Sequence, residues 1–320
     1  MNRKSKYIEF CGKQPVPLHV QPWWLDAVCG SNRWDVALTC DANGRVIGAL
    51  PYFIVRKWGL RMVKMPPLTD YVGAVLCVEN QEITKNYAQE SFRQKVLADL
   101  ISQLPKTAFW YQQFYPEMDN WLPFMWAGWR QTTTYTYRLE RLQNTDHIFA
   151  NFKATVRTNI RRAAQLVQVE FGDDINAFYN LYSQSLTRRG VRLPFEQEIL
   201  QRVDAVLSAR QQRQILFARN PADGVLHAAL YVAHDAETAY FLLWGIQPAH
   251  KQSHAIQLLF WTAIQQLAPR VQHIDFCGSD IPDMEKMIRS FGGVRRPCSI
   301  ISRTSNRFLH ILSILLNRHY

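Results

Sequence analysis

The second half of the sequence orders its expected strands and helices in a way that few folds can accommodate. Three strand-like runs come close together, followed by a helix, a strand, a short helix and a last strand. Their apolar residues repeat at strand or at helical spacing. The expected strands are 214–218, 225–234, 238–246, 273–277 and 298–302, and the helices between them are 253–267 and 282–290. This order predicts an α/β (α+β) domain with a mixed, mostly antiparallel twisted sheet flanked by helices.

The first half predicts a domain of a similar kind. Two of its strands are joined by Asp41-Ala42-Asn43-Gly44, which has the composition of a hairpin turn. The segment 44–50 (GRVIGAL) is similar to 224–230 (GVLHAAL), so we interpret the two halves as copies of one α/β unit. The first half's expected elements are helices 22–29 and 87–104 and strands 35–40, 46–55, 71–78, 108–115 and 131–139.

We place the domain boundary where the pattern changes, around residues 144–147. The chain then divides into a first domain (1–143), a second domain (144–304) and an amphipathic tail (305–320). Three helices are expected at the start of the second domain, over 150–169, 175–189 and 195–209. The first of them is strongly basic.

Composition excludes some classes of protein and leaves others open. The 320 residues are 48% hydrophobic and 20% charged, which is the balance of a folded protein and not of a disordered one. Lysine and arginine total 37 against 26 acidic residues, which gives a net charge of +11. Such a surface attracts phosphates, nucleic acids or anionic lipid head groups.

The side chains that bind metals or form disulfides are scattered. The six cysteines include no C-x-x-C pair, which argues against zinc-ribbon and thioredoxin proteins. His227 and His234 lie on opposite faces of one expected strand, and His250 and His254 have no evident third ligand. We therefore expect no metal and no permanently bound cofactor. No apolar run reaches the roughly 18 residues of a membrane span, and the first residues lack the apolar run of a signal peptide, so we expect a cytoplasmic protein.

The junction between strand 238–246 and the next helix predicts an anion site. A helix that starts after a strand presents backbone N–H groups without helical partners, and these groups bind phosphate. Ser253 is the expected N-cap and Lys251 adds positive charge. The segment His250-x-x-Ser253-x-Ala255 resembles the acyl-CoA pyrophosphate loop of GNAT acyltransferases, R/Q-x-x-G-x-G/A, but departs from it at the first position and the first glycine. An ordinary capped helix is the alternative.

Three further segments resemble the FemABX-like branch of the GNAT superfamily. Residues 274–279 (IDFCGS), with Pro282, Glu285 and 289–293 (RSFGG), resemble its strand ending in D-F-x-G-S, short helix and F-G turn. Residues 152–164 (FKATVRTNIRRAA) resemble its R-x-N-I-R-x-A helix, and 65–71 (MPPLTDY) stand where that branch has an R-G-P-x-x-D turn. The resemblance runs in order from Trp23 to about Ser302.

This resemblance implies tandem GNAT-like domains and transfer of an acyl or aminoacyl group to an amine, without a covalent enzyme intermediate. Such a reaction needs a neutral amine, an activated carbonyl polarised by N–H groups and a route for a proton. Ile288 stands where the family has a lysine, for which Lys286 or Arg289 could substitute. The donor therefore stays open between acyl-CoA and aminoacyl-tRNA.

The candidate site residues follow from these segments. The donor-binding candidates are Gln247, His250, Lys251, Ser253, His254 and Ala255. The catalytic candidates are Asp70, Glu285 and Arg289, and the acceptor-binding candidates are Tyr71, Arg157, Asn159 and Arg161. Each has a structural alternative: Asp70 could close a turn, and the arginines could form a solvated basic helix face. Asp275 we interpret as structural, with the N–H groups of Gly278 and Ser279 as partners.

We therefore expect an N-acyltransferase that acts on an amine of a cell-envelope sugar or peptide precursor, nucleotide- or lipid-linked. The alternatives are a non-catalytic tandem-GNAT scaffold and a basic nucleic-acid-binding protein; tRNA is a partner in the aminoacyl case. The tail repeats apolar residues at helical spacing from Phe308 to Leu316. It could pack on its own domain, on a partner helix or on an anionic bilayer, and the last would make the protein peripheral at the inner membrane surface.

Overall fold

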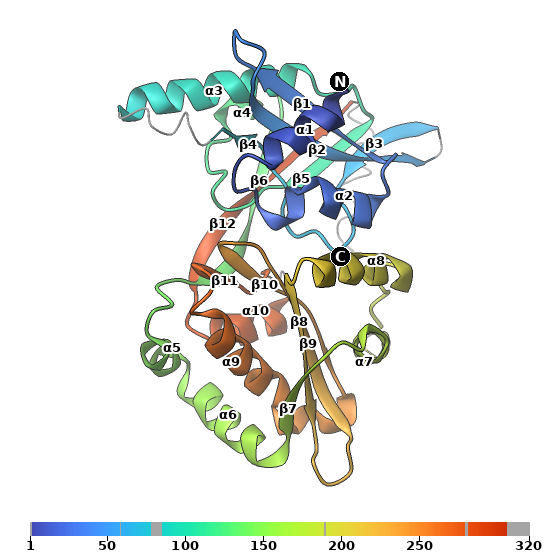
Figure 1. Cartoon of the computed structure of the whole chain (residues 1–320), viewed down its shortest axis with the longest axis vertical. Coiled ribbons are helices and arrows are strands. Elements are labelled where there is room, and N and C mark those ends of the chain that lie inside the picture. Colours follow the sequence, from blue (N-terminus) through green and yellow to red (C-terminus); the bar gives the residue numbers. More distant parts are fainter. Residues whose placement is uncertain (1, 58, 78–84, 189, 279–280, 306–320) are drawn as a thin grey trace. The chain divides into compact units, whose positions relative to one another are not determined.

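The computed structural model describes residues 2–57, 59–77, 85–188, 190–278 and 281–305 and divides the chain into two compact units (Figure 1). Unit 1 comprises residues 1–134 and 297–320, and unit 2 comprises residues 135–296. The chain enters unit 2 within β6 (Arg130–Leu139) and returns to unit 1 within β12 (Val294–Thr304). The predicted boundaries lie later, because Arg138 and Leu139 already pair with unit 2 strand β11, and 300–304 pair with unit 1 strand β5.

Unit 1 is a sheet in the order β1-β2-β3-β5-β12, with β4 paired to β2. Strands β3 and β5 are parallel, and the other pairs are antiparallel. The predicted turn is present: Asp41 Oδ1 accepts from the N–H groups of Asn43 and Arg45, and Gly44 has a φ of 77°. The strands are β1 (Trp34–Cys40), β2 (Val46–Lys57), β3 (Leu60–Lys64), β4 (Val75–Leu76) and β5 (Phe109–Gln113); the helices are α1 (Arg3–Cys11), η1 (Leu18–Val20), α2 (Pro22–Cys29), α3 (Asn86–Ser102) and α4 (Leu122–Trp126).

Unit 2 is a sheet in the order β6-β11-β10-β9-β8-β7, in which β10 and β11 are parallel and the other described pairs are antiparallel. Its strands are β7 (Gln168–Gly172), β8 (Arg213–Arg219), β9 (Leu226–His234), β10 (Thr238–Ile246) and β11 (His273–Asp275). Its helices are α5 (Thr145–Asn151), α6 (Ala154–Leu166), α7 (Ile175–Thr187), α8 (Gln197–Ala209), η3 (Pro248–Ser253), α9 (Ala255–Leu267) and α10 (Pro282–Arg289).

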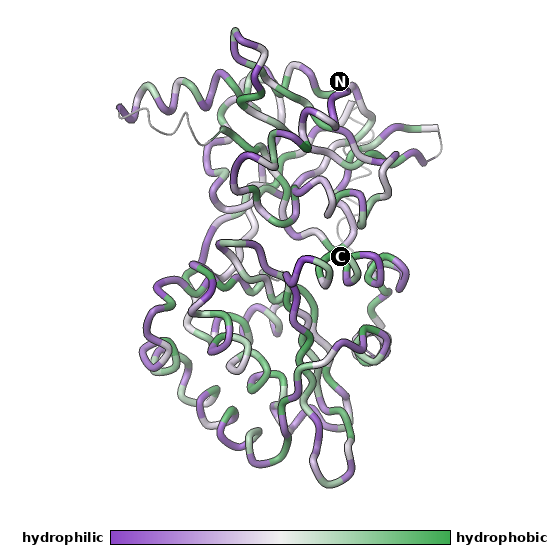
Figure 2. Tube along the Cα trace, viewed as in Figure 1, coloured by the Kyte–Doolittle hydropathy of each residue, from purple (hydrophilic) through white to green (hydrophobic). Residues whose placement is uncertain are grey.

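Helices cover both faces of this sheet (Figure 1). On one face α9 packs against β8, β9 and β10, and four phenylalanines meet there: Phe241 of β10, Phe260 of α9, Phe276 directly after β11 and Phe291 after α10. Figure 2 shows apolar residues along the central strands and along α9. On the other face α7 packs through Phe178 against Tyr231 of β9. The predicted fold class is confirmed.

One predicted helix is wrong in its bounds. The basic segment 150–169 is not continuous, because Phe152 adopts an extended conformation between α5 and α6, and the Lys153 N–H donates to the Ser290 carbonyl. Val167 is extended as well, and 168–172 pair with β8 as a strand. The predicted tail begins at 305, and its residues 306–320 lie outside the described residues.

Candidate functional site

The sheet of unit 2 parts between β10 and β11. The two parallel strands pair only from Thr238–His273 to Tyr240–Asp275, whereas β10 continues to Ile246. In this continuing stretch the register of β10 against β9 shifts between Phe241 and Leu243. A bulge leaves one residue outside the regular ladder, and bulges are frequent beside active sites. The backbone of β10 therefore has an irregular segment where its neighbouring strand has ended.

The loop after β10, residues 247–255, contains all the predicted donor-binding residues; we call it the junction loop. Its start is fixed by the Gln247 N–H, which donates to the His227 carbonyl of β9 at 2.8 Å. His254 is left-handed (φ 54°), and α9 begins at Ala255, the last residue of the junction loop. Ser253 is therefore not the N-cap: its hydroxyl donates to the His250 carbonyl at 2.7 Å and lies 3.4 Å from the Ala255 nitrogen.

A histidine of β9 stacks on a histidine of this loop. The rings of His227 and His250 are 4.0 Å apart and nearly parallel, at 6°. His227 is 6% exposed, and neither of its ring nitrogens has a hydrogen-bond partner among the described residues. Burial lowers the pKa of His227, and the neighbouring His250 lowers it further. His227 is therefore a neutral, flat support for the junction loop.

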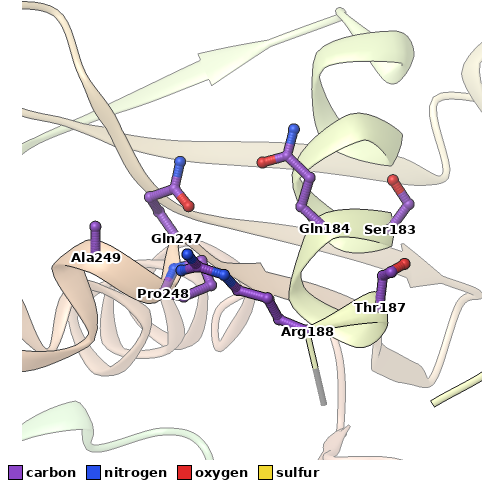
Figure 3. A pocket seen from close by; sticks show the side chains of 7 residues that line it. All are labelled: Ser183, Gln184, Thr187, Arg188, Gln247, Pro248 and Ala249. Carbon is purple, nitrogen blue, oxygen red and sulfur yellow. The ribbon is translucent and has the colours of Figure 1, made fainter. Parts of the chain in front are cut away.

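A cavity of about 610 Å³ lies beside the junction loop (Figure 3). Cavities that hold small ligands have volumes of roughly 300–1,000 Å³. The Arg188 guanidinium brings a cation to it from the end of α7. Its lining residues are Ser183, Gln184, Thr187, Arg188, Gln247, Pro248 and Ala249.

Gly245 sets the distance between β10 and α7 at this place. A Cβ atom on Gly245 would lie 2.9 Å from the Tyr182 nitrogen and 3.0 Å from its Cα. Both are backbone atoms that cannot rotate away. Only glycine lets α7 approach the strand so closely, and the wall of the cavity depends on that approach.

Helix α6 contributes positive charge near the junction loop. Burial lowers the pKa of His254, and the charge of Arg162 lowers it further. Of the predicted acceptor-binding residues, Arg157 donates to the carbonyl groups of Ala150 and Phe152, which ties it to the end of α5. Arg161 is exposed and lies 5.6 Å from the Phe149 ring, and Asn159 is half-buried on the same helix.

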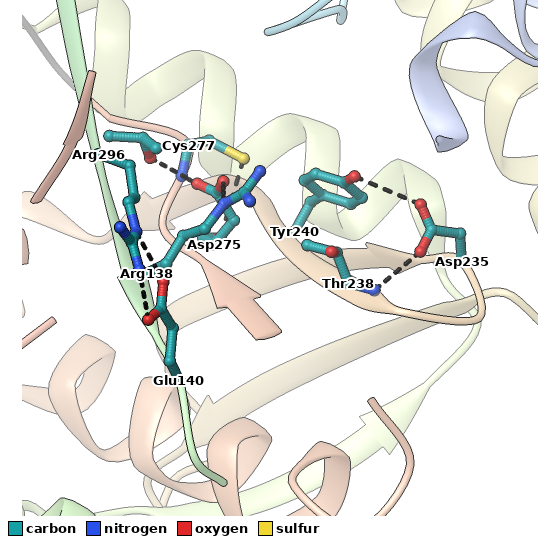
Figure 4. Close-up of polar contacts among 9 residues, drawn as sticks. Arg138, Glu140, Asp235, Thr238, Tyr240, Asp275, Cys277 and Arg296 are labelled. Carbon is teal, nitrogen blue, oxygen red and sulfur yellow. Dashed lines mark hydrogen bonds and ion pairs between the residues drawn. The ribbon is translucent and has the colours of Figure 1, made fainter. Parts of the chain in front are cut away.

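The end of β11 is held by a buried network (Figure 4). Asp275 is fully buried and accepts hydrogen bonds from Arg138 Nε at 2.6 Å, Thr136 Oγ1 at 2.5 Å and the Cys277 N–H at 2.7 Å. The structural interpretation of Asp275 agrees with these contacts. The predicted partner Gly278 forms a left-handed turn with Cys277 (φ 58° and 60°), and Ser279 lies outside the described residues.

Two predicted catalytic residues, Glu285 and Arg289, pair with each other on α10. Glu285 Oε1 accepts from Arg289 Nε at 2.9 Å and from the Tyr137 hydroxyl at 2.6 Å. These two hydrogen bonds, the one from Tyr137 first, lower the pKa of Glu285. A carboxylate stabilised in this way is a weak base, so the geometry suits Glu285 to orienting its neighbours better than to accepting a proton.

The other two predicted residues belong to unit 1. Asp70 is half-buried after the Pro66-Pro67 turn. Tyr71 is 2% exposed, and its ring centroid lies 6.1 Å from that of the buried His19. Their roles stay predictions.

Comparison with known proteins identifies the domain. The family model of the acetyltransferase (GNAT) domain matches residues 150–284, from the end of α5 to α10. The matched residues make up most of unit 2, which we therefore call the GNAT domain. The junction loop and the parting of β10 from β11 both lie inside the matched part of this GNAT domain. No curated protein sequence matches the chain significantly.

Solved structures extend the similarity to the whole chain. FemX shares 12% identity over 98% of both chains, with a TM-score of 0.64. The C-terminal domain of a protein assigned as a lysylphosphatidylglycerol synthetase from Agrobacterium fabrum shares 12% identity over 98% of this chain and 95% of its own, with a TM-score of 0.58. At such identities the likeness is one of fold. The predicted resemblance to the GNAT superfamily agrees with the family model, whereas the likeness to FemX is one of fold.

Sequence reasoning missed the α7 side of the GNAT domain site. Ser183, Gln184, Thr187 and Arg188 line the cavity, and no pattern in α7 marks them except the cation at its end. Within the described ranges, no group of three or more His, Cys, Asp and Glu residues could hold a metal ion. None of the helices described is both long and apolar enough to cross a bilayer.

Proposed function

We propose that this protein is an N-acyltransferase. It moves an acyl or aminoacyl group from acyl-CoA or aminoacyl-tRNA to an amine of a cell-envelope sugar or peptide precursor. The observation that carries the proposal is the junction loop of the GNAT domain, which lies between a parted strand pair and the start of α9 and beside the 610 Å³ cavity. The fold similarity to FemX supports the envelope precursor as acceptor.

The junction loop would bind the phosphate groups of the donor. The first N–H groups of α9, at Ala255 and Ile256, begin a 13-residue helix whose dipole favours an anion. Lys251 is exposed on the loop, and Arg162 lies near His254 at its end. The ring of His227, stacked on that of His250, would hold the loop in shape.

The bulge of β10 would act on the reacting carbonyl. An N–H group turned out of the ladder near Leu242 can donate to the carbonyl oxygen of the donor, and that hydrogen bond strengthens as the oxygen gains negative charge. The acceptor nitrogen forms its bond to the carbonyl carbon, the bond from that carbon to the donor's sulfur or oxygen breaks, and the amine loses one proton. Asp70 is our proposed proton acceptor, and Glu285 with Arg289 would orient the Tyr137 hydroxyl.

In unit 2 the acceptor would bind through the basic helix α6, and in unit 1 we propose Tyr71 as an acceptor-binding residue. Arg161 has an exposed guanidinium that can pair with a phosphate, and Asn159 lies two residues before it. Arg157 would act indirectly, because its hydrogen bonds to Ala150 and Phe152 fix the start of α6.

Binding measurements with the full chain test the donor. Calorimetric titration with acetyl-CoA, and separately with charged tRNA, should show saturable binding of one of them. Lys251→Gln should weaken that binding at least about tenfold, as expected for one charge-assisted hydrogen bond of about 1.5–3 kcal/mol. Arg270→Gln removes an equally exposed cation elsewhere in the GNAT domain and should leave the affinity unchanged.

The outcomes separate the proposal from its alternatives. If neither donor binds, the protein is a tandem-GNAT scaffold and the enzymatic proposal is wrong. If the chain binds unrelated DNA and RNA with a steep salt dependence, and Lys251→Gln has the same effect as Arg270→Gln, it is a general nucleic-acid-binding protein.

A further inference from the structure

The β2–β3 hairpin of unit 1 has a tip that extends past its neighbouring strand. β3 pairs with β5 at Met62 and Val63, whereas the ladder with β2 continues to Lys57–Leu60 (Figure 1). The Arg61 carbonyl still accepts from the Ala108 N–H at 2.9 Å, so among the described residues the last rung, Lys57–Leu60, extends past the strand on the β3 side. A two-stranded end has little stability of its own, so packing within unit 1 gives no reason for its length.

The hairpin is strongly basic. Between Asp41 and Asp70 the sequence contains five basic residues and no acidic one. Four of the five are on this hairpin: Arg56, Lys57, Arg61 and Lys64. Among the described residues no ion pair of Arg56, Arg61 or Lys64 is formed, and the Arg61 Nε has no hydrogen-bond partner.

Two of these cations face each other in the ladder. Arg56 lies directly opposite Arg61, and like charges at opposite positions destabilise an antiparallel pair. An anion bound between the two side chains would remove this repulsion. The free-energy cost of this repulsion in the unbound protein is explained if the hairpin has an anionic partner.

The apolar residue at the tip helps to choose between a nucleic acid and a lipid surface as the anionic partner. Leu60 is directly opposite Lys57 and is 38% exposed, and Trp58 and Gly59 stand between the two in the sequence. An aliphatic side chain between cations gains nothing from a phosphate backbone in water, but it gains free energy when it enters the acyl region below a layer of phosphates. We propose that the tip of the β2–β3 hairpin docks on the surface of an anionic lipid bilayer. This inference does not depend on the proposed acyl transfer.

Vesicle binding by the full chain tests the proposal. Vesicles of phosphatidylcholine with about 30% phosphatidylglycerol, in low salt, provide the anionic surface, and pure phosphatidylcholine is the neutral reference. Each basic residue near an anionic surface contributes about fivefold to partitioning, so R56Q/K64Q should bind roughly 25-fold more weakly. Leu60→Ser should weaken binding at unchanged charge. The matched control K95Q/R270Q removes two exposed cations elsewhere and should retain the affinity of the parent chain.

Each result decides for or against the hairpin. Equal loss in R56Q/K64Q and K95Q/R270Q would mean that net charge alone attracts the chain, and the proposal would be wrong. It would also be wrong if Leu60→Ser bound like the parent, or if the chain preferred tRNA to vesicles and R56Q/K64Q removed that preference. Circular dichroism melting of every variant verifies the fold, and all variants keep residues 306–320, so loss in R56Q/K64Q cannot come from the tail.

Discussion

The replacement of Asp275 by asparagine tests whether the end of β11 is held by a buried charge pair. In the native chain Asp275 and Arg138 are 0% and 4% exposed, and their side chains meet at 2.6 Å. The asparagine side chain would keep the shape and one acceptor oxygen, but it would remove the carboxylate charge that the buried Arg138 guanidinium contacts. Removing one partner of a buried pair costs about 3–5 kcal/mol. Asp275→Asn should lower the free energy of unfolding of the GNAT domain by that amount.

The residue directly after β6 supplies the matched control. Glu140 follows Arg138 by two residues and pairs with Arg296 at 2.7 Å, but the side chains of Arg296 and Glu140 are 45% and 22% exposed. Exposed pairs contribute about 0–1 kcal/mol, so Glu140→Gln should cost less than about 1 kcal/mol. Equilibrium urea unfolding, followed by circular dichroism and tryptophan fluorescence, measures both variants.

A second change separates the buried charge from the lost hydrogen bonds. In the double variant R138M/D275N no cation remains to be stabilised, so the protein should recover at least half of the loss seen in Asp275→Asn. Equal costs for Asp275→Asn and Glu140→Gln would refute the reasoning. So would a double variant that is less stable than Asp275→Asn alone.

Three further outcomes are expected. Gly245→Ala should cost about 1–3 kcal/mol in urea unfolding because its Cβ meets the α7 backbone, whereas Gly12→Ala, whose Cβ would have no atom nearer than 3.6 Å, should cost almost nothing; similar costs would be contrary evidence. Burial lowers the pKa of His19 in the folded protein to about 3. The unfolded chain therefore takes up the proton first as the pH falls below about 6.5. The free energy of unfolding should drop by about 2–3 kcal/mol between pH 7 and pH 4.5. His19→Gln should lack this part of the drop in parallel urea titrations, and an unchanged pH dependence would exclude His19 as its source. Tyr137→Phe removes a hydrogen bond that lowers the pKa of Glu285, so a carboxyl-carbon NMR titration should find that pKa raised; an unaltered value would mean that Arg289 alone sets it.

The fold of unit 2 was predictable because each of its strands and helices has a distinct pattern of apolar residues. Apolar strands such as β9 and β10 and the apolar helix α9 follow one another with short connections, and each has a clear period. The break at Phe152 was not predictable, because it depends on a tertiary contact between the Lys153 N–H and the Ser290 carbonyl, far away in sequence. The strand 168–172 was hidden for a similar reason, since pairing with β8 decides its conformation.

Part of the candidate site could likewise be predicted from the sequence, and part could not. The junction loop is a continuous segment, so its residues lie together wherever the fold places them, and sequence alone could name them. The Ser253 N-cap was wrong because a left-handed His254 starts α9 instead, a conformation that sequence rarely signals outside glycine and asparagine. The α7 wall was missed because its residues meet Gln247 only through the packing that Gly245 permits.

The position of Ile288 bears on the choice of donor. Ile288 is 0% exposed and packs in the core beside Phe291, so a lysine there would have to place its ammonium group among phenylalanine rings or snorkel out along α10. The cations of α10 near this position are Lys286, two residues before Ile288, and Arg289, one residue after it, and both side chains are exposed. Arg289 already donates to Glu285, so its charge is partly balanced. A deep cation at position 288 is therefore disfavoured by the packing of α10 itself. If the family's lysine contributes to binding aminoacyl-tRNA, its replacement by Ile288 makes acyl-CoA the donor that we propose to test first, with its phosphates bound at the junction loop.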